Sequence, residues 1–253
     1  MSCQKYMLWG LLAILLNSCQ KSPKTTHALR TITAQERAIC RDGGCPEFSV
    51  SFPFFEGDAT TATRLNQQIS SWFIAALFLG DDNAPTASDI GEALDQYLLL
   101  ARDYQSEFTP RNSYRGQLNA GLSYQNKYVL SLFLSIELNP VLHPNKSRGA
   151  YLNFDQITGR LIPLQELVSN PQGLSDVIRV VSQQRAYGAA LSAKDATNQI
   201  SVWQINQSLG FDADGLAMVT TNKDPRQNLR LDDQIIQLTW AQITPFLNPQ
   251  YFR

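Results

Sequence analysis

The sequence predicts an α+β fold in which an antiparallel sheet packs with helices in a single globular domain over residues 40–253. Two observations predict this class. Apolar residues recur at helical spacing over 61–79 and 88–108, and from Leu118 onward they recur at every second residue. Helices that precede and follow a run of strands are typical of α+β proteins. Two closely packed halves, 40–110 and 111–253, remain the alternative arrangement.

The first half is expected to contain one strand and two helices. Phe and Val alternate with polar residues over 47–54, which predicts a strand that ends near Pro53. A glycine and three polar residues over 80–83 are expected to end the first helix. Asp89 and Glu92 have the spacing of a capping box near the start of the second helix.

The second half is expected to be mainly strands. Residues 118–124 and 128–138 alternate cleanly around a polar turn, which is the pattern of an antiparallel hairpin with one buried face. The remaining expected elements are strands over 149–155, 160–162, 216–221 and 235–240, a helical turn over 163–167 and a helix over 171–189. Pro245 and Pro249 are expected to lie in a polar tail.

The N-terminus has the layout of an export signal. Lys5 precedes an apolar run over 7–16, which is shorter than the roughly 20 residues that a membrane-spanning helix needs. The next residues, Leu16-Asn-Ser-Cys19, resemble the lipobox of bacterial lipoproteins. We therefore expect a signal peptide over 1–18 and a lipid on Cys19. An ordinary signal peptide or an uncleaved anchor with an unrelated cysteine is the alternative.

The residues after the signal are polar and show no apolar periodicity, so 19–39 is expected to be a flexible tether. Lipid chains on Cys19 would hold the protein to a membrane. Gln20 is not the aspartate that retains many lipoproteins in the inner membrane. The expected location is the cell envelope, on the periplasmic face of the outer membrane.

The charge balance argues against nucleic acid as a partner. The chain has 21 Lys and Arg and 22 Asp and Glu residues. The signal holds only Lys5, so 20 basic and 22 acidic residues remain after its removal. No block of Lys or Arg is present, and phosphate recognition depends on such charge.

Two cysteines remain beyond the signal and the lipidation residue. Cys40 and Cys45 flank an Asp-Gly-Gly turn that lets the chain double back. In an oxidising compartment such a pair is expected to form a disulfide. Two free thiols, or half of a metal site, are the alternatives, although the two histidines lie in unrelated segments.

One stretch of the chain resembles a known family. Tyr151-Leu-Asn-Phe-Asp155, then Thr158-Gly-Arg160 and Leu164-Gln-Glu-Leu167, are similar to a signature of the RsiV-like domain family. This family, largely of unknown function, forms the outer part of RsiV-type anti-sigma factors and accompanies PdaC-type peptidoglycan deacetylases. Weaker matches in the same order are Phe52-Pro53, Leu65-Asn66 with Ile69, Phe211 with 214–216, and 235–247.

The resemblance implies an α+β ectodomain that recognises an envelope partner, which in RsiV-type proteins is lysozyme. Residues 222–228 depart from the family, because they lack its Tyr-rich, Gly-containing stretch. We recognise no sigma-binding segment and no deacetylase domain in the sequence. Sigma control and deacetylation are therefore not expected here.

No catalytic, metal or cofactor site is expected. The sequence has no Gly-x-Ser-x-Gly motif, His27 lies in the expected tether, and His143 lies in a proline-containing loop. Asp212 and Asp214 resemble the start of a calcium loop but lack its closing glutamate, so a turn is favoured. Asp232-Asp233 is expected to lead into a strand.

Several residues are candidates for recognition. Trp72 is expected in the core, whereas Trp203 and Trp240 are either core residues or part of a sugar- or peptide-binding surface. Residues 111–115 form either a recognition loop or a solvated connector. The leading hypothesis is a lipid-anchored, non-catalytic module that binds peptidoglycan or a protein such as lysozyme. The alternative is a cell-wall hydrolase, or an enzyme associated with deacetylation, with an unrecognised site.

Overall fold

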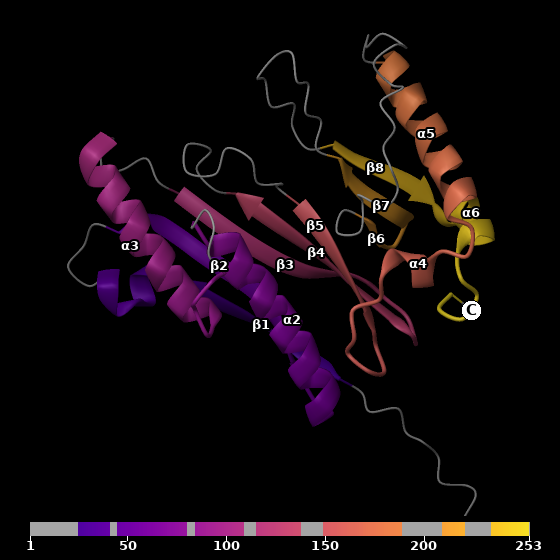
Figure 1. The fold of residues 1–253 in the computed structure, drawn as a ribbon. Coiled ribbons are helices and arrows are strands. Elements are labelled where there is room, and N and C mark those ends of the chain that lie inside the picture. Colours follow the sequence, from indigo (N-terminus) through magenta and orange to yellow (C-terminus); the bar gives the residue numbers. More distant parts are fainter. Residues whose placement is uncertain are drawn as a thin grey trace, which may run out of the picture.

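The computed structural model describes residues 25–40, 45–79, 84–108, 115–137, 149–188, 209–220 and 234–252. Two sheets and several helices form the α+β fold that the sequence predicts (Figure 1). The strands are β1 Thr26–Thr33, β2 Glu47–Glu56, β3 Arg115–Gln125, β4 Val129–Glu137, β5 Gly149–Asp155, β6 Leu209–Phe211, β7 Gly215–Thr220 and β8 Gln234–Thr239. The helices are α2 Ala59–Leu77, α3 Ile90–Phe108, α4 Leu164–Leu167, α5 Pro171–Gly188 and α6 Trp240–Ile243, with 3-10 turns η1 Ala34–Glu36, η2 Ala38–Cys40 and η4 Thr244–Phe246.

The larger sheet has the order β1-β2-β3-β4-β5 and is mixed, whereas an antiparallel sheet was expected. Strands β2 and β3 pair in parallel, with Glu47 opposite Arg115, and the other neighbours pair antiparallel. The parallel pair arises because the chain passes through α2 and α3 between these two strands. A parallel connection needs such a crossover.

Strand β1 corrects the expected tether. Residues 26–33 pair along their whole length with β2, from Thr26 opposite Glu56 to Thr33 opposite Ser49. The pattern was missed because an edge strand needs no buried face, and the first six residues of β1 are all exposed. The folded domain thus begins at about Thr25, before the expected boundary at residue 40.

Helices α2 and α3 cover one face of the larger sheet, which we call the helix face. Their start points follow local hydrogen bonds: the Asp58 side chain accepts from the Thr61 N–H, and the Asp89 side chain accepts from the Glu92 N–H. Buried residues from the sheet and both helices form the first core, including Phe52, Leu65, Phe73, Leu94, Leu98, Leu118, Leu132 and Phe154. Trp72 packs at its margin, half-buried.

The second sheet, in the order β6-β7-β8, packs with α4, α5 and α6 around a separate core. Leu247 and Tyr251 are buried in this core, so the expected polar tail is wrong. The two cores do not coincide with the halves divided at residue 110, because β3, β4 and β5 contribute mainly to the first core. The second sheet lies against part of the larger sheet, opposite the helix face (Figure 1).

A bulge in β3 connects the two cores. Leu122 is opposite Leu132, but Tyr124 is opposite Ser131, so Ser123 is the additional residue. The bulge turns Tyr124 away from the helix face, and its ring contacts Phe211 in the second core at 6.0 Å between centroids. The sequence alternation had placed Leu122 and Tyr124 on one face.

Two further features bear on the predicted disulfide and on membrane-spanning helices. The expected disulfide is present, with Cys40 and Cys45 joined and their Cα atoms 5.3 Å apart. In the part of the chain that the structure describes, no helix has both the length and the apolar character to span a membrane.

Candidate functional site

The most distinctive surface is a row of small polar side chains on the sheet face opposite the helices. Strand pairing places one residue from each of four adjacent strands side by side. We call these residues the polar row: Thr31, Ser51, Asn119 and Ser135. Gly149 of β5 continues the row beyond Ser135.

The row faces solvent. Thr31 is exposed, the other three side chains are half-buried, and the hydroxyls of Thr31 and Ser51 hydrogen-bond at 3.0 Å. Strands lie about 4.8 Å apart, so the row spans roughly 14 Å. Because none of its side chains is charged, it offers hydroxyl and amide groups to a neutral polar ligand.

The residues beside the row add an amide and an aromatic ring. Gln117 is exposed and donates through Nε2 to Oδ1 of Asn119 at 3.2 Å. On the other side, Gly121 is opposite Phe133, and a Cβ built on Gly121 meets nothing within 4 Å. Glu137, opposite Gln117, is the nearest charged residue by register. The surface therefore combines uncharged hydrogen-bonding groups with a half-buried ring.

The same sheet face is covered farther along by the second sheet. Ser131 and Asn153, which are both buried, hydrogen-bond to each other at 2.7 Å between Oγ and Oδ1. Asn153 Nδ2 donates to the carbonyl of Leu209, and Ser131 Oγ accepts from the N–H of Phe211. This buried node, consisting of Ser131, Asn153 and the two β6 backbone groups, joins the sheets.

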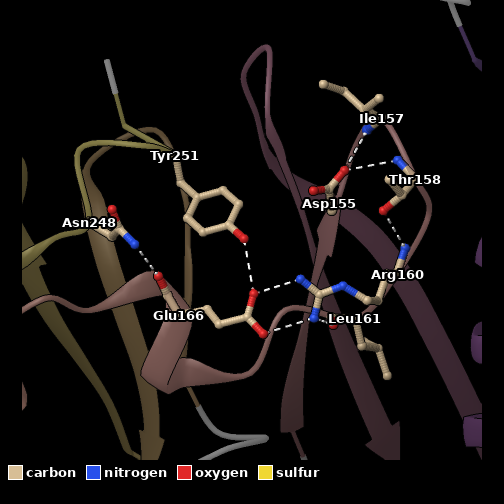
Figure 2. Close-up of polar contacts among 8 residues, drawn as sticks. All are labelled: Asp155, Ile157, Thr158, Arg160, Leu161, Glu166, Asn248 and Tyr251. Atoms are coloured by element: carbon tan, nitrogen blue, oxygen red, sulfur yellow. Dashed lines mark hydrogen bonds and ion pairs between the residues drawn. The ribbon is translucent and has the colours of Figure 1, made fainter.

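The stretch that carries the family resemblance forms a turn and an ion pair (Figure 2). Oδ1 of Asp155 accepts from the N–H groups of Ile157 and Thr158, each at 2.9 Å. Gly159 closes the turn with φ of 69°, a conformation that favours glycine. A Cβ there would also lie 2.6 Å from the backbone oxygen of Thr61.

The ion pair links this turn to the C-terminal segment. The guanidinium of Arg160 donates to both carboxylate oxygens of Glu166, at 2.9 and 2.6 Å, and Tyr251 donates to Glu166 Oε2 at 3.1 Å (Figure 2). The Arg160 hydrogen bond lowers the pKa of Glu166, and burial raises the pKa of Tyr251. Three hydrogen bonds to this one carboxylate thus join the turn after β5 to the C-terminal segment.

The Asp212 loop is a turn, as favoured from the sequence. Oδ1 of Asp212 accepts from the N–H groups of Asp214 and Gly215 and from the Gln237 side chain. Trp240 packs against Tyr124, Phe211 and Phe252 and donates to the carbonyl of Ala213. Trp240 is therefore half-buried and packs against the second core.

A shallow groove of about 420 Å³ lies between α2 and the edge of the larger sheet. Its lining is mainly apolar and includes Trp72, Ala75, Ile136, Leu152 and Leu161. Only Gln68 and Ser71 supply polar side chains to the lining. The groove therefore has little to orient a polar substrate.

Among the described residues, no group of three or more His, Cys, Asp or Glu side chains could hold a metal ion. Several predicted residues lie outside the described residues: the lipidation residue Cys19, His143, Trp203, Asp232, Asp233 and the segments 111–114 and 222–228. Their roles stay predictions.

Sequence reasoning missed the polar row. Its four residues come from four strands, and each is an ordinary solvent-facing position in its own strand. Only the register, including the parallel β2–β3 pairing, brings them together. The alternation within each strand indicates a polar face for Ser51, Asn119 and Ser135, but it does not show which residues are neighbours.

No known protein family and no curated protein matches the chain. Two solved structures are similar to it. A DUF3298 family member from Bacteroides fragilis is 16% identical, with 89% of this chain and 94% of that chain covered and a TM-score of 0.47. A DUF3298 family protein from Pseudomonas aeruginosa is 12% identical, with 90% and 96% covered and a TM-score of 0.48. Both of these solved structures are thus DUF3298 family proteins, and DUF3298 is an uncharacterised domain family.

Proposed function

We propose that the protein is a lipid-anchored envelope module that binds the glycan strands of peptidoglycan through the polar row, without turning them over. The lipobox at Leu16–Cys19 supports the anchor. The single observation that supports this binding site is the uncharged polar row, which crosses four strands.

The chemistry of the row suits a sugar chain. Glycan strands present many hydroxyl and acetamido groups, which pair with hydroxyl and amide side chains. Phe133, half-buried beside the space at Gly121, offers an aromatic surface for the apolar face of a sugar ring. A face that displays such groups on paired strands requires little reorganisation on binding.

The test is co-sedimentation of the mature lipidated protein, in detergent, with insoluble peptidoglycan. The double variant Gln117→Ala/Asn119→Ala removes two amides from the surface. Each net hydrogen bond contributes about 0.5–1.5 kcal/mol, so losing two should weaken retention by about fivefold or more. Gln67→Ala, an exposed amide on α2 at the helix face, is the matched control and should bind as the unmodified protein does.

Three outcomes would overturn the proposal. Unchanged retention of the double variant would exclude the polar row as the site. Soluble fragments released from peptidoglycan would favour the hydrolase alternative. Binding to purified lysozyme but not to peptidoglycan would favour the protein partner that the family resemblance implies.

A further inference from the structure

The early start of β1 leaves a short connection to the expected lipid. Thr25 is six residues after Cys19, and the strand begins at Thr26. A fully extended chain covers at most about 3.3–3.6 Å per residue, so Thr25 lies within roughly 20 Å of Cys19. A lipid on Cys19 would therefore hold the start of β1 close to the membrane surface.

The start of β1 shares one end of the larger sheet with two turns. Thr26 is opposite Glu56 at the end of β2, and β3, parallel to β2, ends at the same side. The β3–β4 turn follows there, and Asp155, at the end of β5, is opposite Val129.

Direct hydrogen bonds make this end one continuous surface. The N–H of Gln156 donates to the carbonyl of Tyr128 at 2.8 Å, which joins the two turns. Thr61 Oγ1, in the first turn of α2, donates to the carbonyl of Ile157 at 2.8 Å. We call this surface, formed by residues 126–128 and 156–159 and the start of α2, the anchor end.

The anchor end carries the side chains of a membrane interface. Ile157 is 48% exposed in the turn, although the Asp155 hydrogen bonds that shape this turn do not require an apolar side chain there. Lys127 is exposed and places its ammonium 5.2 Å from the ring centre of half-buried Tyr128. An aliphatic residue, an amphipathic aromatic and a lysine favour the boundary between headgroups and acyl chains.

The charges at this end nearly balance. Arg64 and Lys127 are exposed bases, whereas Glu56 and Asp58, just before α2, and Asp155, at the end of β5, are acids. Attraction to anionic lipid alone would therefore be weak. The lipid on Cys19 would supply the local concentration that makes a weak contact effective.

We propose that the anchor end rests on the membrane that holds the Cys19 lipid, with Ile157 and Tyr128 at the depth of the headgroups. This inference rests on the proposed lipid anchor. The strands then rise from the membrane, and Thr31, five residues along β1, lies roughly 17 Å above the anchor end. The polar row therefore faces sideways, near the membrane, toward glycan strands that run along it.

The experiment places a tryptophan at the anchor end of the full mature protein. Ile157→Trp is reconstituted in phosphatidylethanolamine and phosphatidylglycerol vesicles whose acyl chains are brominated, and bromine quenches nearby tryptophan. Val180→Trp is the matched control, since Val180 is 45% exposed on α5, which extends away from this end (Figure 1). The fluorescence of unmodified protein is subtracted, and Tyr128→Trp serves as a second reporter.

We expect loss of the added fluorescence at 157 and 128 and none at 180. Equal quenching at all positions, or none at 157 and 128, would overturn the docking. Mass spectrometry of the same samples detects the lipid on Cys19, and co-sedimentation measures peptidoglycan binding. Lipidated protein that binds peptidoglycan without quenching would refute the docking alone, whereas protein without lipid would refute the anchor as well.

Discussion

Ser131 and Ser135 lie four residues apart on β4 and point to the same sheet face, yet their surroundings are opposite. Ser131 is fully buried beneath the second sheet and belongs to the buried node. Ser135 is half-buried in the polar row. One face of one sheet is thus divided into a covered half that holds the molecule together and an open half available for recognition.

The difference shows that a polar residue at an alternate strand position does not by itself indicate solvent. In the covered half, every polar group of the node has a partner, because a buried polar group without one is costly. In the open half, water can satisfy the same groups. Substitutions in the two halves should therefore act on different properties, stability in one and binding in the other.

The largest expected effect is at Asn153 in the covered half. Asn153→Ala removes the acceptor of the Ser131 hydroxyl and the donor to the Leu209 carbonyl. Each buried group left without a partner costs about 1–3 kcal/mol, so we expect a loss of about 3 kcal/mol in the free energy of unfolding. Urea denaturation of the full chain measures it.

Asn119→Ala is the control in the open half and should change the free energy of unfolding by less than about 0.5 kcal/mol. Similar losses in the two variants would contradict the division of the face. They would mean that the polar row also carries tertiary structure.

The elements of the fold also differ in how far the sequence predicts them. Helical periodicity was sufficient for α2 and α3, because each buries one face, and alternation was sufficient for β4, whereas β5 is buried on both faces. Neither pattern marks an edge strand, so β1, with Leu29 70% exposed, was assigned to a tether. Leu247 and Tyr251 were missed because prolines and polar neighbours hide two widely spaced buried residues.

The second limit on prediction from the sequence was the pairing between segments that are far apart in the chain. Nothing local to Ser131 or Asn153 distinguishes them from Ser135 or Asn119. What separates them is the second sheet, whose β6 residues lie more than 50 positions farther along the chain. The polar row depends in the same way on long-range register, including one parallel pair.

Tyr151 lies between the covered and open halves of the face, and its ring contacts that of Phe133 at 5.0 Å between centroids. The pH dependence of stability tests whether its phenol is buried there. Burial, together with the nearby Asp212 charge, raises the pKa of Tyr151 to about 12 from 10.0. The folded state therefore favours the protonated phenol, and this contribution is complete below pH 10 and is lost as the pH rises through 12.

We expect Tyr151→Phe to lose less unfolding free energy between pH 10 and pH 12 than the unmodified protein does. Urea midpoints at the two pH values measure this difference. Tyr128→Phe, which removes a phenol at the half-buried margin of the second core, is the control and should follow the unmodified protein. An identical decline in Tyr151→Phe would show that the covered half opens before Tyr151 titrates.

The smallest expected effect is at Gly121, and its sign is what matters. Glycine inside a strand is destabilising by roughly 0.5–1 kcal/mol relative to alanine, and an added Cβ at Gly121 would meet nothing within 4 Å. Gly121→Ala should therefore raise the free energy of unfolding slightly. Gly210→Ala in β6 is the opposite case, because its Cβ would lie 2.1 Å from the Tyr151 ring and force the sheets apart.

Gly121 lowers stability without relieving a clash, so its presence needs another explanation. The open space that it leaves beside Phe133 would explain it if a sugar ring binds there. We accordingly expect Gly121→Ala to be slightly more stable than the unmodified protein yet to bind peptidoglycan more weakly, because the new methyl group occupies the ligand's position. Urea unfolding and co-sedimentation on one preparation measure both. Lower stability would mean that the open half is covered, and unchanged binding would move the ligand away from Phe133.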